Sequence, residues 1–200
     1  MATRSFIHVQ REDGNWARIY CHNDGYYENN GRLLHQFYNS QERAEALVAL
    51  GDLSSLGESI GVKHRFDFYQ DLSKKHGGNY SEMKADPEYQ RLSSMCNFYG
   101  RDRGEENVEA QIGESLEDVF EKDEFTYVWR DGEWLAMSYT DDLSNLRPLK
   151  ELLVENNIPT EADSVEVAAA LALEIPGTLD SSDQPEETAE ADTPKPVWAM

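Results

Sequence analysis

Apolar and aromatic residues gather in two pairs of short segments, and each pair is split by an Asp-Gly dipeptide. The first pair covers residues 6–10 and 16–20, and the second covers residues 125–130 and 133–139. β-Branched and aromatic residues favour strands, and Asp-Gly tolerates the positive φ angles of a two-residue type I′ turn. The pattern therefore predicts two β-hairpins.

A two-residue turn at residues 13–14 would fix the register of the first hairpin. Val9 would then lie opposite Arg18, and Ile7 would lie opposite Tyr20. The other face of this hairpin would carry Phe6, His8, Ala17 and Ile19. Both faces mix polar and apolar residues, so this register does not identify the side that faces the core.

The second hairpin, with its turn at residues 131–132, is predicted to place Trp129 opposite Trp134 and Arg130 opposite Glu133. An aromatic cross-strand pair adds about 0.2–1 kcal/mol over an alanine pair. Both hairpins contain the pattern Asp-Gly-x-Trp. This similarity suggests one antiparallel sheet built from an N-terminal and a C-terminal hairpin.

Apolar residues recur at helical spacing between the hairpins and after the second one. Asp86 followed by Pro87 marks a helix start, because proline at the first helical position loses no hydrogen bond. Asn39 and Glu42 suggest a capping box before another helix. Residues 52–61 and 63–78 are predicted to be largely irregular. The predicted helices cover residues 32–38, 40–50, 87–96, 115–122 and 143–156. Pro148 interrupts the last of these, and a start of that helix at Pro148 is the alternative.

These elements predict an α+β fold in which helices are inserted between the strands of one antiparallel sheet. Residues 1–158 are expected to form a single domain. Residues 151–200 hold 12 acidic residues and one lysine, so half of the net charge of −21 lies in the last quarter of the chain. Residues 159–200 are therefore interpreted as a largely disordered acidic tail, with a short helix at residues 164–174.

The chain carries 39 acidic and 18 basic residues. Such a balance disfavours direct binding of nucleic acid, because phosphates are bound by lysine and arginine. An acidic surface most often serves solubility. It also attracts basic partners or imitates the phosphate array that a nucleic-acid enzyme expects.

The location of the protein is predicted from its apolar runs and its cysteines. No apolar run approaches the roughly 20 residues that span a bilayer, and the N-terminus lacks the apolar segment of a secretory leader. The two cysteines, Cys21 and Cys96, are far apart in the sequence. These features predict a reduced cytoplasmic protein without a membrane partner.

Residues 19–27 hold the densest group of side chains capable of chemistry. Tyr20, His22, Asp24 and Tyr26 are candidates to line a site for a small polar ligand, since aromatic faces with a carboxylate recur in such sites. Cys21 is a candidate nucleophile. No sequence motif places a general base beside the Cys21 thiol, and cysteine is usually buried. No catalytic residue is therefore assigned.

A zinc site is the other chemistry considered for residues 19–27. Adjacent residues on a strand point to opposite faces, and the spacing lacks the ligand pairs of structural zinc. The sequence therefore predicts no metal and no cofactor. The potential ligands weighed for zinc are Cys21, His22, Asp24, His35, His64 and Cys96.

Residues 98–105 form a second candidate binding segment. Arg101 and Arg103 stand beside glycines in a chain with few basic residues, which suits a phosphate or carboxylate ligand. Asp102 lies between them. The alternative is an internal cluster in which these arginines pair with Asp102, Glu105 or Glu106, and this is the more frequent outcome.

Several segments resemble a family of small proteins encoded in bacteriophages and prophages. The resemblance covers about residues 1–140 and implies a phage accessory protein in the host cytoplasm, without an established activity. Asn23 stands where the family usually has tryptophan, and Tyr27 stands where it has proline. The matching runs are residues 2–5, 19–22, 24–26, 30–31, 50–56 and 98–105.

Three functions follow from charge and resemblance. The first is a non-enzymatic phage protein that binds and modulates a host protein, such as a defence or nucleic-acid-handling enzyme, through an acidic surface that mimics DNA. The second is a small ligand-binding or nucleotide-processing enzyme with a site between residues 19–27 and 98–105. The third is a virion component, in which the acidic tail and Trp198 make assembly contacts.

Overall fold

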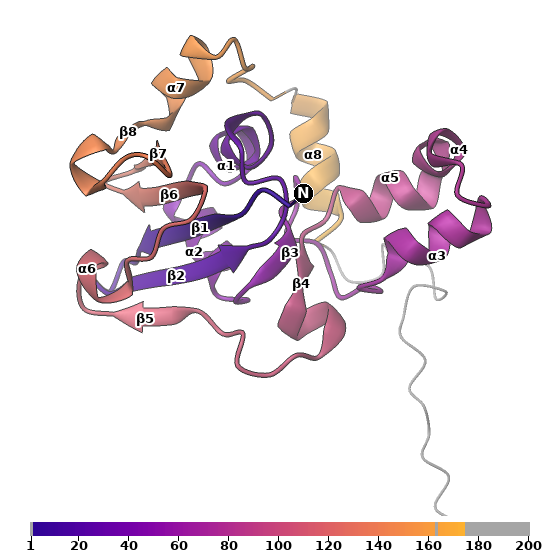
Figure 1. The fold of residues 1–200 in the computed structure, drawn as a ribbon, viewed down its shortest axis with the longest axis horizontal. Helices are drawn as coiled ribbons and strands as arrows, with labels where there is room; N and C mark the ends of the chain where they lie inside the picture. Colours follow the sequence, from indigo (N-terminus) through magenta and orange to yellow (C-terminus); the bar gives the residue numbers. More distant parts are fainter. Residues whose placement is uncertain (1, 163, 175–200) are drawn as a thin grey trace, which may run out of the picture.

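The computed structural model describes residues 2–162 and 164–174, whose strands form one mixed sheet. The strand order is β4-β3-β2-β1-β6-β7-β8, and β5 pairs with the same edge of β2 as β3 does (Figure 1). The pairs β1–β6 and β2–β3 are parallel, and the remaining pairs are antiparallel. The strands are β1 (Ser5–Gln10), β2 (Trp16–Cys21), β3 (Leu53–Ser55), β4 (Asn97–Phe98), β5 (Gln111–Gly113), β6 (Phe125–Arg130), β7 (Glu133–Ser138) and β8 (Arg147–Pro148).

The α+β class is confirmed, and the two hairpins do share one sheet. The sheet is mixed and not wholly antiparallel, because β6 lies parallel to β1 where the hairpins join. A parallel pair needs a long connection, and here about 100 residues, which include β3, β4 and β5 beside the helices, lie between β2 and β6.

The predicted register of the first hairpin is wrong by one residue. Ile7 pairs with Ile19. The amide of Gly14 donates to the carbonyl of Arg11 (3.0 Å), and the amide of Arg11 donates to the carbonyl of Asn15 (2.8 Å). With Gly14 at φ +86°, the loop has one more residue than a type I′ turn and ends in a glycine bulge.

The observed register separates the two faces of this hairpin cleanly. A shift of one residue moves every side chain of one strand relative to its partner. One face is now apolar and buried in the main core. That face carries Ile7, Val9, Ala17, Ile19 and Cys21.

The second hairpin confirms its prediction. Asp131 and Gly132 have φ angles of +53° and +82°, as a type I′ turn requires. Trp129 pairs with Trp134, with ring centroids 5.3 Å apart. The same dipeptide thus makes two different turns in this chain.

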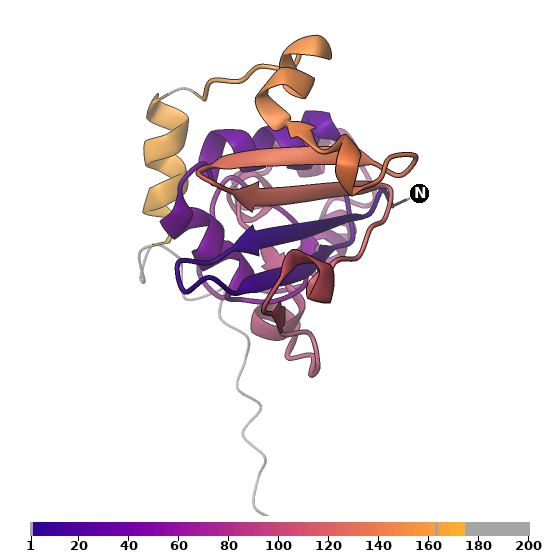
Figure 2. The ribbon, with the colours of Figure 1, turned by 90° about the vertical axis from the view of Figure 1, so that its left-hand side faces the viewer.

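Helices cover both faces of the sheet. On the side of the main core lie α1 (Arg32–Phe37), α2 (Gln41–Val48), α7 (Leu149–Glu155) and α8 (Ser164–Ala172). On the opposite side, α6 (Leu116–Val119) covers a smaller cluster that includes Val128. Figure 2 shows α6 in front of the strands, with α1 and α2 behind them.

A helical lobe lies beyond β3 and β4, to the right of the sheet in Figure 1. It contains α3 (Phe68–Lys75), α4 (Tyr80–Ala85) and α5 (Pro87–Ser93). The predicted start of α5 is confirmed, since the Asp86 carboxylate accepts from the amide of Glu88 (2.9 Å). The lobe has its own core, formed by Phe68, Leu72, Met83, Leu92 and Met95.

Three sequence predictions for helices need correction. The helix predicted over residues 143–156 begins only at Leu149, directly after Pro148, because a residue before proline avoids the helical conformation and residues 147–148 form β8. Residues 68–75 form α3 and not an irregular segment, because Phe68 and Leu72 fall one helical turn apart and are buried together. The cap of α2 is Ser40 and not Asn39, since the Ser40 hydroxyl accepts from the amide of Arg43 (3.2 Å).

The chain after residue 158 contains α8, as predicted, and this helix contacts the domain. Ala170 is buried in the main core. The Glu174 carboxylate accepts from the amide of Ile60 (2.9 Å) and from Arg43 (2.6 Å). The acidic stretch predicted from residue 180 onward lies outside the described residues. No helix of the described chain is long and apolar enough to cross a membrane.

His8 is a fully buried histidine on the α6 side of the sheet. Its Nδ1 lies 3.3 Å from the carbonyl oxygen of Tyr127, its Nε2 accepts from the amide of Glu121 (3.4 Å), and its ring stacks on Phe120. These contacts fit the neutral imidazole. Burial lowers the pKa of His8 from 6.5 to about 4.

We expect this histidine to make stability depend on pH. The unfolded chain takes up a proton near pH 6.5 and the folded chain only near pH 4, so stability falls as the pH drops through this window. Between pH 7 and pH 5 the loss due to His8 is about 2 kcal/mol. Urea unfolding of the natural chain and of His8→Phe at both pH values checks this. Equal losses in the two proteins would exclude His8 as the source.

Candidate functional site

The two segments predicted to form a site lie on neighbouring strands. Residues 19–27 leave β2, and residues 98–105 leave β4, with β3 between them. The amide of His22 donates to the carbonyl of Leu53 (3.1 Å), and the amide of Tyr99 donates to the carbonyl of Asp52 (3.1 Å). The segments are therefore held to the same strand, although their candidate side chains do not converge on one pocket.

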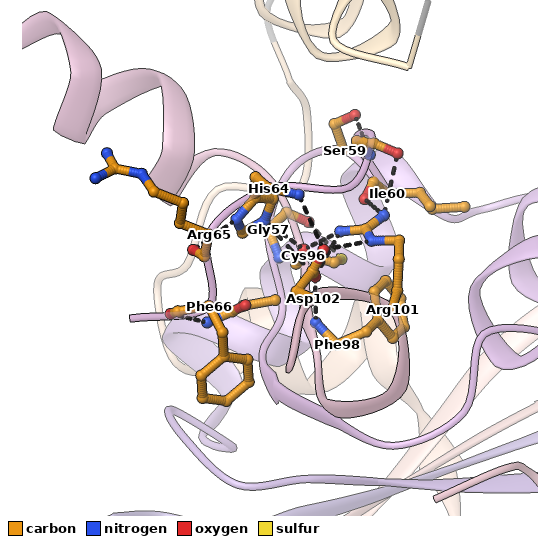
Figure 3. A network of polar contacts seen from close by, with 12 residues as sticks. Gly57, Ser59, Ile60, His64, Arg65, Phe66, Cys96, Phe98, Arg101 and Asp102 are labelled. Carbon is orange, nitrogen blue, oxygen red and sulfur yellow. Dashed lines mark hydrogen bonds and ion pairs between the residues drawn. The ribbon is translucent and has the colours of Figure 1, made fainter. Parts of the chain in front are cut away.

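Arg101 is committed to an internal network (Figure 3). Its Nη1 donates to the carbonyls of Ile60 (2.8 Å) and Gly61 (3.1 Å), and its Nη2 donates to the carbonyl of Cys96 (2.6 Å). Its Nε and Nη2 also donate to the Asp102 carboxylate at 2.8 Å and 2.9 Å. A guanidinium has five N–H donors, so these contacts leave none for a ligand.

Asp102 completes this network, which we call the Arg101–Asp102 clamp. Its side chain is fully buried. Besides Arg101, its carboxylate accepts from the backbone amides of His64 (3.1 Å) and Phe98 (2.8 Å). The Nε2 of His64 lies 3.1 Å from the carbonyl oxygen of Cys96. The clamp thus ties β4 and the turn after it to the loop that leads into the helical lobe.

The remaining candidate residues are distributed over separate surfaces. Arg103 is 52% exposed, pairs with Glu105 (2.9 Å) and lies over the ring of Phe66. Tyr20 contacts the Nδ1 of His22 through its hydroxyl (2.9 Å), and burial raises the pKa of this phenol. These side chains therefore have local partners of their own.

Asp24 and Tyr26 are the two sequence candidates that line a substantial cavity. The Tyr26 hydroxyl donates to the Asp24 carboxylate (3.3 Å), and Asp24 has φ +56°. We call this space, of about 780 Å³, the interlobe cavity. Its walls are the loop of residues 23–29, β3, β4 and the three helices of the lobe.

The lobe contributes side chains that the sequence analysis did not single out. They include Tyr69 from α3, Tyr80 and Lys84 from α4, and Tyr89 from α5. Burial is the main cause that raises the pKa of Tyr89, and the nearby Tyr80 is the next largest cause. Sequence spacing alone does not predict this wall, because three helices contribute to it.

Asn97 on β4 also lines the interlobe cavity. It is 5% exposed. Its Nδ2 donates to the carbonyl of Phe66 (3.0 Å), whereas its Oδ1 has no hydrogen-bond partner among the described residues. Buried polar atoms in folded proteins are normally paired, so this acceptor sets the site apart from an ordinary crevice.

The described residues contain no activated cysteine. Burial raises the pKa of the Cys21 thiol to about 12, and burial also raises that of Cys96. Cys21 receives a contact from the Nδ2 of Asn30 (3.2 Å), and the Cys96 sulfur lies 3.2 Å from the Tyr38 hydroxyl. Neither sulfur has a histidine base. In the part of the chain that the structure describes, no group of three or more His, Cys, Asp or Glu could hold a metal ion.

Both thiols are expected to be unreactive in the native protein. A thiol with a pKa of about 12 is ionised in roughly one molecule in ten thousand at pH 8, and both sulfurs are inaccessible. Dithiodipyridine should therefore label the folded protein very slowly and label both cysteines at once in guanidinium chloride. Cys96→Ala identifies which thiol reacts. Rapid labelling of the native chain would contradict this prediction.

Comparison of the chain with protein-family models, curated proteins and solved structures gave no match.

Proposed function

We propose that the protein is a non-enzymatic phage accessory protein that binds and modulates a basic host protein through an acidic surface. The observation that supports it is a run of exposed carboxylates in residues 106–118, a segment that contains β5 and most of α6. Within the described residues, none of these carboxylates forms an ion pair with a lysine or an arginine. This acidic edge consists of Glu106, Glu109, Glu114, Glu117 and Asp118.

Arginines close to the acidic edge have carboxylate partners outside it. Arg18 pairs with Glu121, and Arg103 pairs with Glu105. Arg11, which lines the same crevice as Glu109, pairs with Asp13 (3.2 Å). Because these arginines are already paired, the negative charge of the five carboxylates of the edge is not neutralised. Uncompensated charge of one sign steers an oppositely charged partner into contact.

The resemblance to phage-encoded proteins supports a host protein as the partner and the host cytoplasm as the location. A host enzyme that handles nucleic acid carries a basic surface for phosphates. An acidic edge can occupy that surface in place of DNA. A defence enzyme of this kind is therefore the target class that we propose, while a basic protein of the virion is the alternative.

Affinity capture from host cells tests this proposal. The natural chain should retain a basic protein. A variant with all five edge carboxylates changed to amides should lose it. The matched control removes the same charge elsewhere, at Glu42, Glu82, Asp131, Glu133 and Glu151, which are also exposed, and should still capture the partner. Equal capture by both variants would overturn the role of the edge.

A chain ending at Glu174 separates the acidic edge from the acidic residues that follow. It keeps α8 and the contacts of Glu174 with Arg43 and Ile60. We expect it to retain the partner. Loss of capture would instead assign binding to residues 175–200. Detection of the protein in purified phage particles would favour the virion alternative.

A further inference from the structure

The interlobe cavity has the size of a small-ligand site. Such sites have volumes of about 300–1,000 Å³, and this cavity measures about 780 Å³. It lies between the helical lobe and the loop of residues 23–29, whereas the acidic edge lies in residues 106–118. A ligand of the cavity is therefore distinct from a partner bound at the acidic edge.

Three hydrogen-bond acceptors in the lining of the cavity have few or no donors among the described residues. The buried Oδ1 of Asn97 has no partner among the described residues. The exposed carboxylate of Asp67 does not cap the helix that it precedes. The carboxylate of Asp24 receives only the long contact from Tyr26 (3.3 Å) among the hydrogen bonds of the described chain. A buried acceptor without a donor is unfavourable for the folded protein, so a ligand that donates hydrogen bonds matches this lining.

Four tyrosine rings also line the cavity. Tyr26, Tyr69 and Tyr80 are 36%, 48% and 52% exposed, and all three line the cavity. Tyr69 and Tyr89 lie edge to face with centroids 6.4 Å apart. Tyrosine faces attract cations through their quadrupole.

Lys84 shows that this wall accepts a positive group. Its Nζ lies 4.7 Å from the centroid of the Tyr80 ring. Lys84 is the one lysine or arginine among the described residues that line the cavity, whereas two carboxylates, those of Asp24 and Asp67, line it. The net charge of −21 adds a general attraction for cations.

We propose that the interlobe cavity binds a guanidinium compound. A guanidinium is planar, stacks on aromatic rings and presents five N–H donors. These properties match tyrosine faces combined with carboxylate and amide acceptors on separate walls. The ligand is a free guanidinium metabolite or an arginine side chain of a peptide. The inference rests on the cavity alone and does not depend on the acidic edge.

Titration of the full chain with N-acetyl-arginine methylamide tests the inference. Calorimetry should show saturable binding, and the side-chain amide resonance of Asn97 should shift with the same saturation. The citrulline analogue, which is neutral and of similar shape, should not bind. Methylguanidinium and a Gly-Arg-Gly peptide separate the two sources: binding of methylguanidinium alone indicates a metabolite, and tighter binding of the peptide indicates a protein side chain.

Two pairs of variants give matched controls. Asp24→Asn should weaken the arginine probe about fivefold or more, whereas Asp131→Asn should not, although both aspartates are exposed with positive φ. Tyr80→Ala should weaken it similarly, whereas Tyr139→Ala should not, although Lys122 lies over the Tyr139 ring as Lys84 lies over Tyr80.

Three outcomes would overturn the inference. The first is the absence of saturable binding of the arginine probe. The second is equal binding of the citrulline analogue, and the third is an unchanged affinity for the arginine probe in both cavity variants. The acidic-edge variant should still bind the probe. Failure of partner capture and failure of probe binding are therefore distinguishable.

Discussion

The Asp102→Ala variant is expected to unfold with a free energy about 3–5 kcal/mol lower than that of the natural chain. The carboxylate is fully buried and accepts from Arg101 and from the backbone amides of His64 and Phe98. Its removal leaves a mostly buried guanidinium without its counter-charge and two amides without acceptors. Urea unfolding at pH 7 followed by circular dichroism measures the change.

Arg103→Ala is the matched control for this change, because Arg103 is in the same turn, Tyr99–Arg103. Its side chain is half exposed and pairs with the partly exposed Glu105. Exposed ion pairs contribute at most about 1 kcal/mol, so this variant should remain close to the natural chain. Similar losses in the two variants would show that the Arg101–Asp102 clamp is no more important than a surface pair.

Trp129→Ala is expected to lower the free energy of unfolding by about 3–5 kcal/mol. Trp129 is 1% exposed, and its ring packs against Trp134 in the second hairpin. Its Nε1 donates to the Oε1 of Gln41 on α2 (2.7 Å), so the residue links sheet and helix layer. The change creates a large cavity and leaves an amide oxygen without its donor.

Tyr139→Ala, just after the same hairpin, provides the comparison. Tyr139 is 64% exposed, and surface substitutions usually change stability by less than about 0.5 kcal/mol. Thermal unfolding of both variants should therefore separate them clearly. A small effect of Trp129→Ala would mean that the core on this side of the sheet rearranges to fill the space.

The two hairpins show how far local sequence predicts this fold. Both contain Asp-Gly, yet only Asp131-Gly132 forms the type I′ turn. In the first hairpin, an apolar face with Ile7 paired to Ile19 requires one more residue in the loop. Burial of a whole face stabilises the hairpin more than the turn preference of two residues does, and the choice of face depends on helices elsewhere in the chain.

The candidate site, like the hairpins, could be predicted from local sequence only in part. Arg101 was recognisable as unusual from its neighbours, and its pairing with Asp102 was among the predicted alternatives. Three of its acceptors are carbonyls of Ile60, Gly61 and Cys96, which approach it only in the folded chain. The interlobe cavity could not be predicted, because its tyrosines come from three helices, one of which was taken for an irregular segment.

The salt dependence of binding to the captured host protein tests the proposed function most directly. If the acidic edge makes the contact, the dissociation constant of the natural chain should rise steeply between about 50 and 200 mM salt, because screening strengthens over this range. The variant with amides at Glu106, Glu109, Glu114, Glu117 and Asp118 should bind weakly with a shallower slope. A dissociation constant that changes with neither salt nor these five substitutions would contradict the proposal.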